Sequence, residues 1–405
     1  MLLLSILFML VSSFATVSAF TLSDGGDDPH DDTGEPTETR DSDGTVSIQT
    51  DVMTIVLNPD LPSYQYWYTP NDNGSLARFM VTYMMIVEFE DSNGDGVYQP
   101  NETLAFAPLD AFDWNLQTGT VKNGDGQNIE VYTSYTKGGL SDHWEDDWFK
   151  DWMPGYNNHE EEQPSLLSDE GSNDYNFSRF EHMTLQFYSH IYMNNYTGTV
   201  TDDGGVKASY MVLGGVELKI DVGIGNFPFL STTSKVAVLN YLREDVASSE
   251  TQDYYFVLHE DTGDYEHDSS ENMQQLGEVF KNHDENHDGI GDTTQQISLV
   301  EATTDVTRGF YTWLNTAVMT MLNGSQTAVI VGASYWTDGN GLLLFFAYPN
   351  FDGGSILHDP SLKLIEGGSP YTPPVGLFNI PIGYYALFGA TVVLIAIVGF
   401  VVKRR

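Results

Sequence analysis

The sequence predicts an all-β fold: an antiparallel β-sandwich ectodomain of one or two lobes, followed by a C-terminal transmembrane helix. Short runs rich in β-branched and aromatic residues recur between Gly, Asn and Asp turns from residue 46 onward. Cysteine is absent, so an exported chain of this kind has no disulfide to stabilise it. The chain closes with an uncharged apolar stretch and a basic end, the pattern of a membrane anchor.

The chain begins with an apolar run that is typical of a secretory signal peptide. This run ends within residues 1–19 at Val17, Ser18 and Ala19, a pattern suited to signal peptidase. No Lys or Arg precedes the run, so an uncleaved N-terminal anchor is the alternative. Residues 20–45 are dense in Asp, Gly and Pro and lack apolar periodicity, which predicts a disordered acidic leader.

Residues 46–366 are expected to form the β-rich extracellular region. Within 181–193, apolar residues alternate with polar and aromatic ones, as in a half-buried strand. Residues 216–222 alternate too, and their outward face is expected to carry Glu217, Lys219 and Asp221. Many short strands between turns favour an antiparallel sandwich over a βαβ sheet. Further strands are expected at 79–90, 129–135, 236–242, 254–259, 327–336 and 342–348.

Three stretches of this region depart from the strand pattern. Residues 269–282 carry apolar side chains at helical spacing and predict the one convincing helix. Residues 143–176 are acidic and rich in Trp, and are expected to form a long excursion from a sheet edge. A break between two lobes, if present, is expected within 244–270.

The C-terminal residues predict an anchor. Residues 367–381 are rich in Gly, Ser and Pro and are expected to form a stalk. Residues 382–402 carry no charge and are long enough to span the roughly 30 Å hydrocarbon core. The basic residues 403–405 suit a cytoplasmic tail, whereas a buried core helix, the alternative, leaves them unexplained. We therefore expect a single-pass cell-membrane protein that contacts the lipid bilayer through 382–402, with its N-terminal bulk extracellular.

The charge of the chain narrows the classes of partner. The sequence contains 58 acidic and 16 basic residues, a formal net charge of −42. Nucleic acid is not expected as a partner, because phosphate binding needs clustered Lys and Arg. Such a surface fits a protein that stays soluble at high salt or one that takes up divalent cations.

The most specific motif is D-x-N-x-D-G-x5-E at residues 91–102, which matches the calcium loop of an EF-hand over its full length. Alternate oxygen side chains and one carbonyl would converge on Ca²⁺, and a final Glu would bind it through both oxygens. The flanks are strand-like, so we expect this loop at a hairpin; a turn without metal is the alternative. The predicted ligands are Asp91, Asn93, Asp95, Val97, Gln99 and Glu102.

A second loop follows the predicted helix and resembles the first half of an EF-hand or a dockerin-type loop. Gln295 stands where a bidentate Glu would complete the coordination, so we expect weaker binding of Ca²⁺. A solvated acidic turn is the alternative. The predicted ligands are Asp284, Asn286, Asp288, Ile290 and Asp292.

No motif assigns catalytic residues. The chain lacks H-E-x-x-H and G-x-S-x-G motifs and a phosphate-binding Gly loop, and carboxylates are too abundant for a pair to be informative. The Trp residues at 144, 148 and 152 could form a sugar-stacking or docking surface, although packing of the insertion onto its sheet is the simpler interpretation. Sequons predict glycosylation at Asn73, Asn101, Asn176, Asn195 and Asn323.

Two stretches, VELKIDVGIGNFPF at 216–229 and FFAYPNFDGGSILHDPSL at 345–362, carry a resemblance. Together with the signal peptide, acidic ectodomain and anchor, they resemble uncharacterised membrane-anchored cell-surface proteins of archaea. This resemblance implies no catalytic residue. We expect a non-catalytic, calcium-stabilised ectodomain acting in adhesion or envelope structure, with a cell-surface protein or glycan as partner. The alternative is an anchored extracellular hydrolase, or a solute- or carbohydrate-binding protein, whose site is lined by the Trp-rich insertion.

Overall fold

A computed structural model describes residues 37–50, 52–70, 77–124, 126–141, 177–246, 254–260, 263–265, 294–301, 306–337, 341–364 and 368–370. Strands account for most of these residues, and they pair antiparallel in two large sheets and one hairpin. The predicted all-β fold class is therefore confirmed for the described part of the chain.

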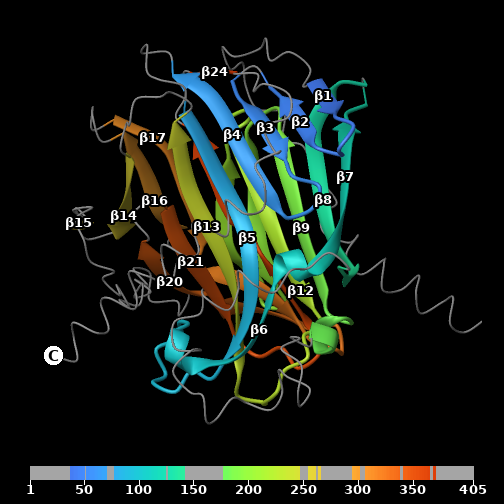
Figure 1. The fold of residues 1–405 in the computed structure, drawn as a ribbon, viewed down its shortest axis with the longest axis vertical. Helices are drawn as coiled ribbons and strands as arrows, with labels where there is room; N and C mark the ends of the chain where they lie inside the picture. Colours follow the sequence, from blue (N-terminus) through green and yellow to red (C-terminus); the bar gives the residue numbers. More distant parts are fainter. Residues whose placement is uncertain are drawn as a thin grey trace, which may run out of the picture. The chain divides into compact units, whose positions relative to one another are not determined.

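Ten strands form the first sheet, here called sheet A. They are β1 (Thr37–Arg40), β2 (Val46–Gln49), β3 (Thr54–Leu57), β4 (Ser63–Pro70), β5 (Ala77–Phe89), β6 (Thr103–Pro108), β13 (Lys235–Val246), β20 (Gly332–Thr337), β21 (Gly341–Tyr348) and β24 (Gly368–Pro370). The order is β1-β2-β3-β4-β5-β13-β21-β20, with β24 paired to β4 and β6 to β5 (Figure 1). The long apolar β5 lies in the middle of this sheet.

Twelve strands form the second sheet, sheet B. They are β7 (Phe112–Lys122), β8 (Asn128–Leu140), β9 (Thr184–Tyr192), β12 (Glu217–Gly225), β14 (Tyr254–Glu260), β15 (Gly263–Tyr265), β16 (Thr294–Glu301), β17 (Val306–Leu314), β18 (Thr316–Thr320), β19 (Gln326–Ile330), β22 (Ser355–His358) and β23 (Ser361–Leu364). Strands β7, β8 and β9 lead to β12, which is the centre of the sheet.

Sheet B divides into two branches at β12. One edge of β12 pairs with β9, while the other edge pairs first with β23 and then with β22. Strand β23 continues to β17, β16, β14 and β15, whereas β22 continues to β18 and β19. Only Asp359 and Pro360 connect β22 to β23, so these two residues lie at the fork.

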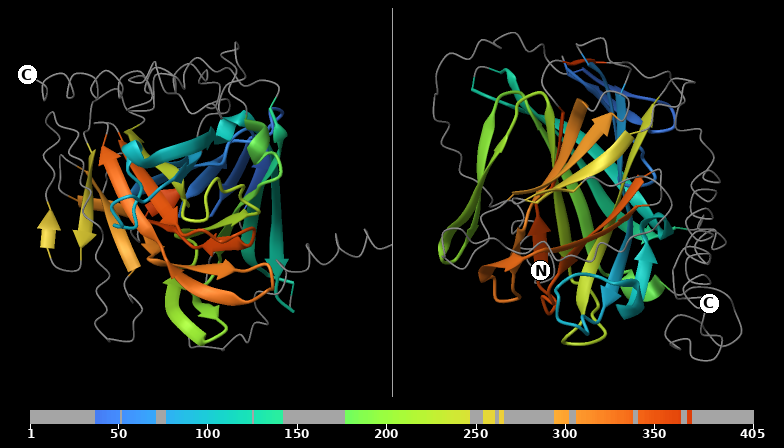
Figure 2. Two further views of the ribbon diagram at one scale, coloured as in Figure 1. Left: turned by 90° about the horizontal axis from the view of Figure 1, so that it is seen from below. Right: turned by 90° about the vertical axis from the view of Figure 1, so that its left-hand side faces the viewer.

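A separate hairpin and three short 3-10 helices complete the described structure. Strands β10 (Tyr196–Asp202) and β11 (Gly205–Val212) pair with each other. The hairpin lies beside β18 and β19, where the Ala328 N–H donates to Asp202 Oδ2 at 3.2 Å (Figure 2). The 3-10 helices are η1 (Pro100–Glu102), η2 (Leu109–Ala111) and η4 (Phe177–Phe180).

One hydrophobic core joins the inner faces of sheets A and B. Rings from the two sheets meet directly: the centroids of Tyr83 on β5 and Phe187 on β9 are 4.2 Å apart. Tyr64 on β4 and Tyr135 on β8 form an edge-to-face pair at 5.6 Å. Burial of such rings is the main favourable term of folding. This face-to-face packing has the character of a sandwich, and residues 34–405 cluster as one compact unit. Much of the range 244–270, where the sequence would place a lobe break, lies outside the described residues.

The alternating pattern of 181–193 is confirmed: Met183, Leu185 and Phe187 are all buried in the core. The single strand expected at 327–336 is wrong, because the chain crosses there from β19 in sheet B to β20 in sheet A. Gly332 explains the crossing. A Cβ at this position would lie 2.1 Å from Gly96 O, so only glycine allows the backbones to approach so closely.

Two expected boundaries also shift. Residues 37–40, assigned to the disordered leader, form β1 and pair with β2 through a turn in which Asp43 accepts the Thr45 N–H. Residues 368–370, assigned to the stalk, form β24 and pair with β4. In both cases hydrogen bonding to an existing strand orders a stretch whose composition predicts none.

Several expectations lie outside the described residues. These are the signal peptide at 1–19, the leader up to residue 36, the Trp-rich insertion from residue 143 onward, the helix at 269–282, the stalk beyond residue 370 and the anchor at 382–405. No helix within the described ranges is long and apolar enough to cross a membrane.

Candidate functional site

The predicted calcium loop connects β5 to η1, and its side chains shape it through three local turns. In each turn a side-chain oxygen accepts a backbone N–H two or three residues further on, as Asx turns do. The pairs are Gly94 N to Asp91 Oδ1 at 2.9 Å, Asp95 N to Asn93 Oδ1 at 2.9 Å, and Val97 N to Asp95 Oδ1 at 3.0 Å. Gly96, with φ of 83°, turns the chain as the motif requires.

Glu102 is the residue of this loop whose surroundings fit a cation best. It is only 6% exposed, and its Oε1 accepts the Ser92 N–H at 3.0 Å and the Ser92 hydroxyl at 2.9 Å. Its second oxygen, Oε2, is buried and accepts no hydrogen bond. A buried carboxylate oxygen without a partner costs free energy, and a bound Ca²⁺ would remove that cost.

Side-chain N–H donors, however, already contact two of the other predicted ligands. The Lys235 ammonium on β13 donates to Asp91 Oδ2 at 2.6 Å, and Gln99 Nε2 donates to Asp95 Oδ2 at 2.7 Å. Burial alone would raise the pKa of Asp91, but Lys235 and the nearby backbone N–H groups outweigh it and lower that pKa. Among the described residues, no three acidic or His side chains are placed to hold a metal ion together. The loop has the donor set for calcium, and binding would require some of these oxygens to exchange partners.

The other sequence-derived sites are only partly visible. The second predicted loop, residues 284–292, lies outside the described residues, as do Asn73 and Asn176. Asn101, Asn195 and Asn323 are exposed, as a glycosylation site requires. Asn195 Oδ1 accepts the Gly214 N–H, and Asn323 Oδ1 accepts the Ser325 N–H. Neither of these bonds uses the amide nitrogen to which a glycan would be attached.

A second constellation, which sequence reasoning did not single out, lies on the face of sheet B that points away from the core. Five ionisable side chains form an alternating chain of acids and bases, here called the ionic cluster: Glu130 on β8, His190 on β9, Asp221 and Lys219 on β12, and Asp359 at the fork. His190 Nδ1 lies 2.6 Å from Glu130 Oε1, and His190 Nε2 lies 3.2 Å from Asp221 Oδ2. The Lys219 ammonium contacts Asp221 Oδ1 and lies 3.1 Å from Asp359 Oδ1.

The pKa values of the two aspartates in the ionic cluster shift in opposite directions. Burial would raise the pKa of Asp221, but Lys219 and His190 outweigh it and hold that pKa well below its usual range. For Asp359 burial prevails, and the nearby Asp221 adds to it, so the pKa of Asp359 rises to about 6. Burial would lower the pKa of His190, but Asp221 and Glu130 raise it to about 9. At neutral pH the cluster therefore contains an imidazolium and an ionised Asp221 beside a readily protonated Asp359.

Stacked aromatic rings cover one side of the ionic cluster. Tyr192 lies parallel to His190, with ring centroids 5.6 Å apart, and stacks on Tyr196 of the β10–β11 hairpin at 4.3 Å. Tyr192 is 9% exposed, and the Lys219 side chain is 5% exposed. This burial keeps bulk water away from the Lys219 ammonium, which strengthens each electrostatic interaction in the cluster.

A partial signal for this cluster was present in the sequence. The alternation of 216–222 placed Glu217, Lys219 and Asp221 on one face, as the structure confirms, but it indicated a solvent-facing surface. Lys219 is instead buried, because β9 and the connection between β22 and β23 flank it. Asp359 lies 140 residues further along the chain, and no local pattern connects it to Lys219.

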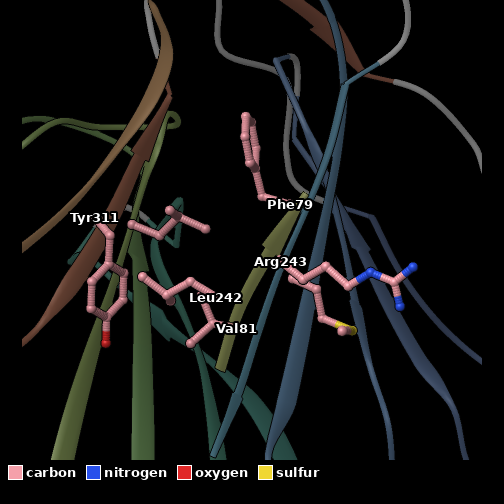
Figure 3. A pocket seen from close by; sticks show the side chains of 7 residues that line it. Phe79, Val81, Leu242, Arg243 and Tyr311 are labelled. Atoms are coloured by element: carbon pink, nitrogen blue, oxygen red, sulfur yellow. The ribbon is translucent and has the colours of Figure 1, made fainter. Parts of the chain in front are cut away.

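The pocket shown in Figure 3 gives no second candidate for chemistry. Phe79, Val81, Leu242 and Tyr311 line it together with Met80, Leu362 and Arg243. The Arg243 guanidinium points away from Tyr311 in this view. The walls are thus apolar and lack the convergent polar groups that an active site needs.

No protein-family model matches the chain, and no curated protein is significantly similar to it.

Proposed function

We propose that the chain is a calcium-stabilised, single-pass extracellular surface protein that acts in adhesion or envelope structure. The observation that carries the proposal is the complete calcium motif between β5 and β6, in which the buried Glu102 Oε2 lacks a partner. An ion held there would join η1 to the end of β5, which pairs with the central strand β13. A cation at this position would therefore stabilise the middle of sheet A.

The rest of the proposal rests on composition and on the ends of the chain. The apolar start, the acidic bulk and the uncharged stretch before the terminal basic residues suit a secreted and anchored protein. A large antiparallel fold with exposed sequons suits an extracellular module. The apolar pocket described above gives the alternative, an anchored hydrolase or solute-binding protein, less support than a structural role.

Calcium titration of the purified protein, followed by thermal melting, tests the proposal. A ligand that binds only the native state adds about RT ln(1 + [L]/Kd) to the free energy of unfolding, or about 2.7 kcal/mol at a hundredfold excess over Kd. We expect Asp95→Ala to abolish most of the calcium-dependent rise in Tm. Asp60→Ala, at an exposed turn position away from the loop, should retain it. If chelation leaves the Tm of the native protein unchanged, the loop is a turn that binds no stabilising calcium.

The topology has its own test. Protease applied to intact cells should remove the ectodomain and spare a C-terminal tag, because residues 403–405 are proposed to be cytoplasmic. Cleavage of the tag from outside would contradict the anchored arrangement while leaving the calcium proposal intact.

A further inference from the structure

We infer that Lys219 and Asp359 become joined by an intramolecular amide bond, formed by the folded chain itself with Asp221 as the acid–base group. The product would be an isopeptide cross-link between β12 and the connection of β22 to β23. It would be a covalent modification that the calcium proposal neither requires nor implies.

The geometry places a nucleophile beside an electrophile. The Lys219 Nζ lies 3.1 Å from Asp359 Oδ1 and also contacts Asp221 Oδ1. The amine is therefore held in hydrogen-bond contact with the carboxyl group whose carbon it would attack, and such fixed placement makes the reaction effectively intramolecular. Strand pairing fixes both partners, because Lys219 is opposite Ser361 in the register of β12 and β23, and the Ile220 N–H donates to Pro360 O at 2.8 Å.

The protonation states suit condensation. An amine attacks a neutral carboxylic acid far more readily than a carboxylate, and burial moves Asp359 toward its neutral form by raising its pKa to about 6. Asp221 stays ionised, since Lys219 and His190 hold its pKa low, so it can accept a proton from the ammonium. Two adjacent carboxyl groups whose environments separate their pKa values divide into an acid and a base.

The surroundings favour the amide over its hydrolysis. Tyr192 and Tyr196 form a stacked layer beside the cluster, and Lys219 is almost fully buried. A site that excludes water limits the reverse reaction and strengthens the electrostatic pull on the transferred protons.

The reaction balances without any co-reactant. The Lys219 ammonium carries three protons: Asp221 accepts the first, and the free amine then attacks Cγ of Asp359. A second proton passes from the nitrogen to the hydroxyl group of Asp359, which leaves as water, and the third remains on the amide nitrogen. Asp221 finally releases its proton to solvent. One C–N bond forms, one C–O bond breaks, and nothing is oxidised or reduced.

The Lys235–Asp91 pair is an internal contrast. Its amine and carboxylate lie 2.6 Å apart, closer than Lys219 and Asp359. However, Lys235 is 27% exposed, Asp91 also accepts the backbone N–H groups of Gly94 and Gly96, and none of the contacts described for Asp91 is to a second carboxyl group. Both pairs bring an amine close to a carboxyl group. Of the two, the Lys219–Asp359 pair is the one that has a second carboxyl group, Asp221, beside it.

The location gives the bond a mechanical role. Asp359 lies where sheet B divides, so a link to Lys219 would fasten both branches to the central strand. The chain has no cysteine, and this amide would supply the covalent restraint that disulfides give other exported proteins.

Peptide mapping of the full-length protein tests the inference. Trypsin should fail to cut after Lys219 and should release residues 208–235 joined to residues 309–363 as one branched species, lighter than their sum by one water. Asp359→Asn should give the same branched species with loss of ammonia in place of water. Recovery of separate peptides ending at Lys219 and containing Asp359 from the native protein would overturn the inference. A loss of water confined to residues 208–235 would assign the bond to Asp221 and would overturn it equally.

Three variants separate the cross-link from the ion pairs. Lys219→Arg keeps a positive charge between the two aspartates, but its guanidinium does not condense, so we expect complete loss of the branched species. Asp221→Asn should fold and leave most chains without the bond. Lys235→Arg, at the exposed pair, should leave the branched species at the level of the native protein. A branched species that persists in Lys219→Arg would contradict the assignment.

Discussion

This protein contains two contacts between lysine and aspartate side chains, and the two differ in how far water reaches them. In the predicted calcium loop, the partly exposed Lys235 pairs with Asp91, which also accepts backbone N–H groups. In the ionic cluster, the buried Lys219 lies between Asp221 and Asp359, and His190 of the same cluster stacks on Tyr192. Water solvates the first pair in part, whereas the second depends on its own members for compensation. Removal of one partner is therefore expected to cost little at the first pair and several kcal/mol at the second.

The variant Lys219→Met should give the largest effect on stability, and it tests whether burial distinguishes the two lysine sites. In chains without the cross-link, removal of the ammonium leaves Asp221 and Asp359 buried without their shared cation, which typically costs about 3–5 kcal/mol, and in cross-linked chains the same change removes the covalent bond itself. We expect a fall of this size in the free energy of unfolding, measured by urea denaturation. The matched change Lys207→Met, at the hairpin contact with Asp202, should have little effect. Equal losses for the two variants would show that burial does not distinguish the sites.

The pH dependence of the ionic cluster follows from His190. Its pKa is about 9 in the folded chain, above the ordinary value of about 6.5, so its contribution is complete below about pH 6.5 and disappears as the pH rises through about 9. The shift corresponds to a contribution on the order of 3 kcal/mol.

We therefore expect the difference in unfolding free energy between the native protein and His190→Gln to shrink as pH increases from 6 to 10. His182→Gln, at an exposed position, should show no such trend. A difference that grows with pH would contradict the proposed sign, since it would mean that neutral His190 is the stabilising form.

A smaller effect is expected where the calcium loop crosses β20. In Gly332→Ala the added Cβ would meet Gly96 O at 2.1 Å, and overpacking of this kind costs about 1–3 kcal/mol. We expect a lower Tm and a weaker calcium response, because the loop must move away from β20. Gly124→Ala, where an added Cβ meets nothing, is the control. A normal calcium response in Gly332→Ala would show that β20 does not position the loop.

Sequence reasoning predicted one of the two regions and not the other, for a physical reason. The calcium motif is contiguous, so spacing alone places Asp91 and Glu102 in one loop. The ionic cluster depends on the pairing of β12 with β9 and β23, which no local pattern specifies. Lys235 is 144 residues from Asp91, so its contact with the loop was equally hidden.

The same distinction between local and long-range features applies to the fold. Alternation predicted β9 and β12, and β-rich runs predicted others such as β5 and β21; burial of Leu185 and Phe187 confirms the face assigned to β9. The crossing at Gly332 was missed because the sequence there continues a β-type run without a visible turn. Its cause is the approach of Gly96 from another segment, which only the assembled sheets reveal.

The last and smallest effect on stability is expected from Lys235→Met. This contact is partly solvated, so its loss should change the free energy of unfolding by about 1 kcal/mol or less in the absence of calcium. Its effect on calcium should be opposite in sign. The ammonium occupies Asp91 Oδ2, the oxygen that the first ligand of the loop would offer, and a positive charge there repels an incoming cation. We expect tighter calcium binding by Lys235→Met in a calorimetric titration, with Lys207→Met unchanged. Weaker binding would mean that Lys235 organises the loop for the ion; in that case the two lysines would act alike, each holding a carboxylate in place.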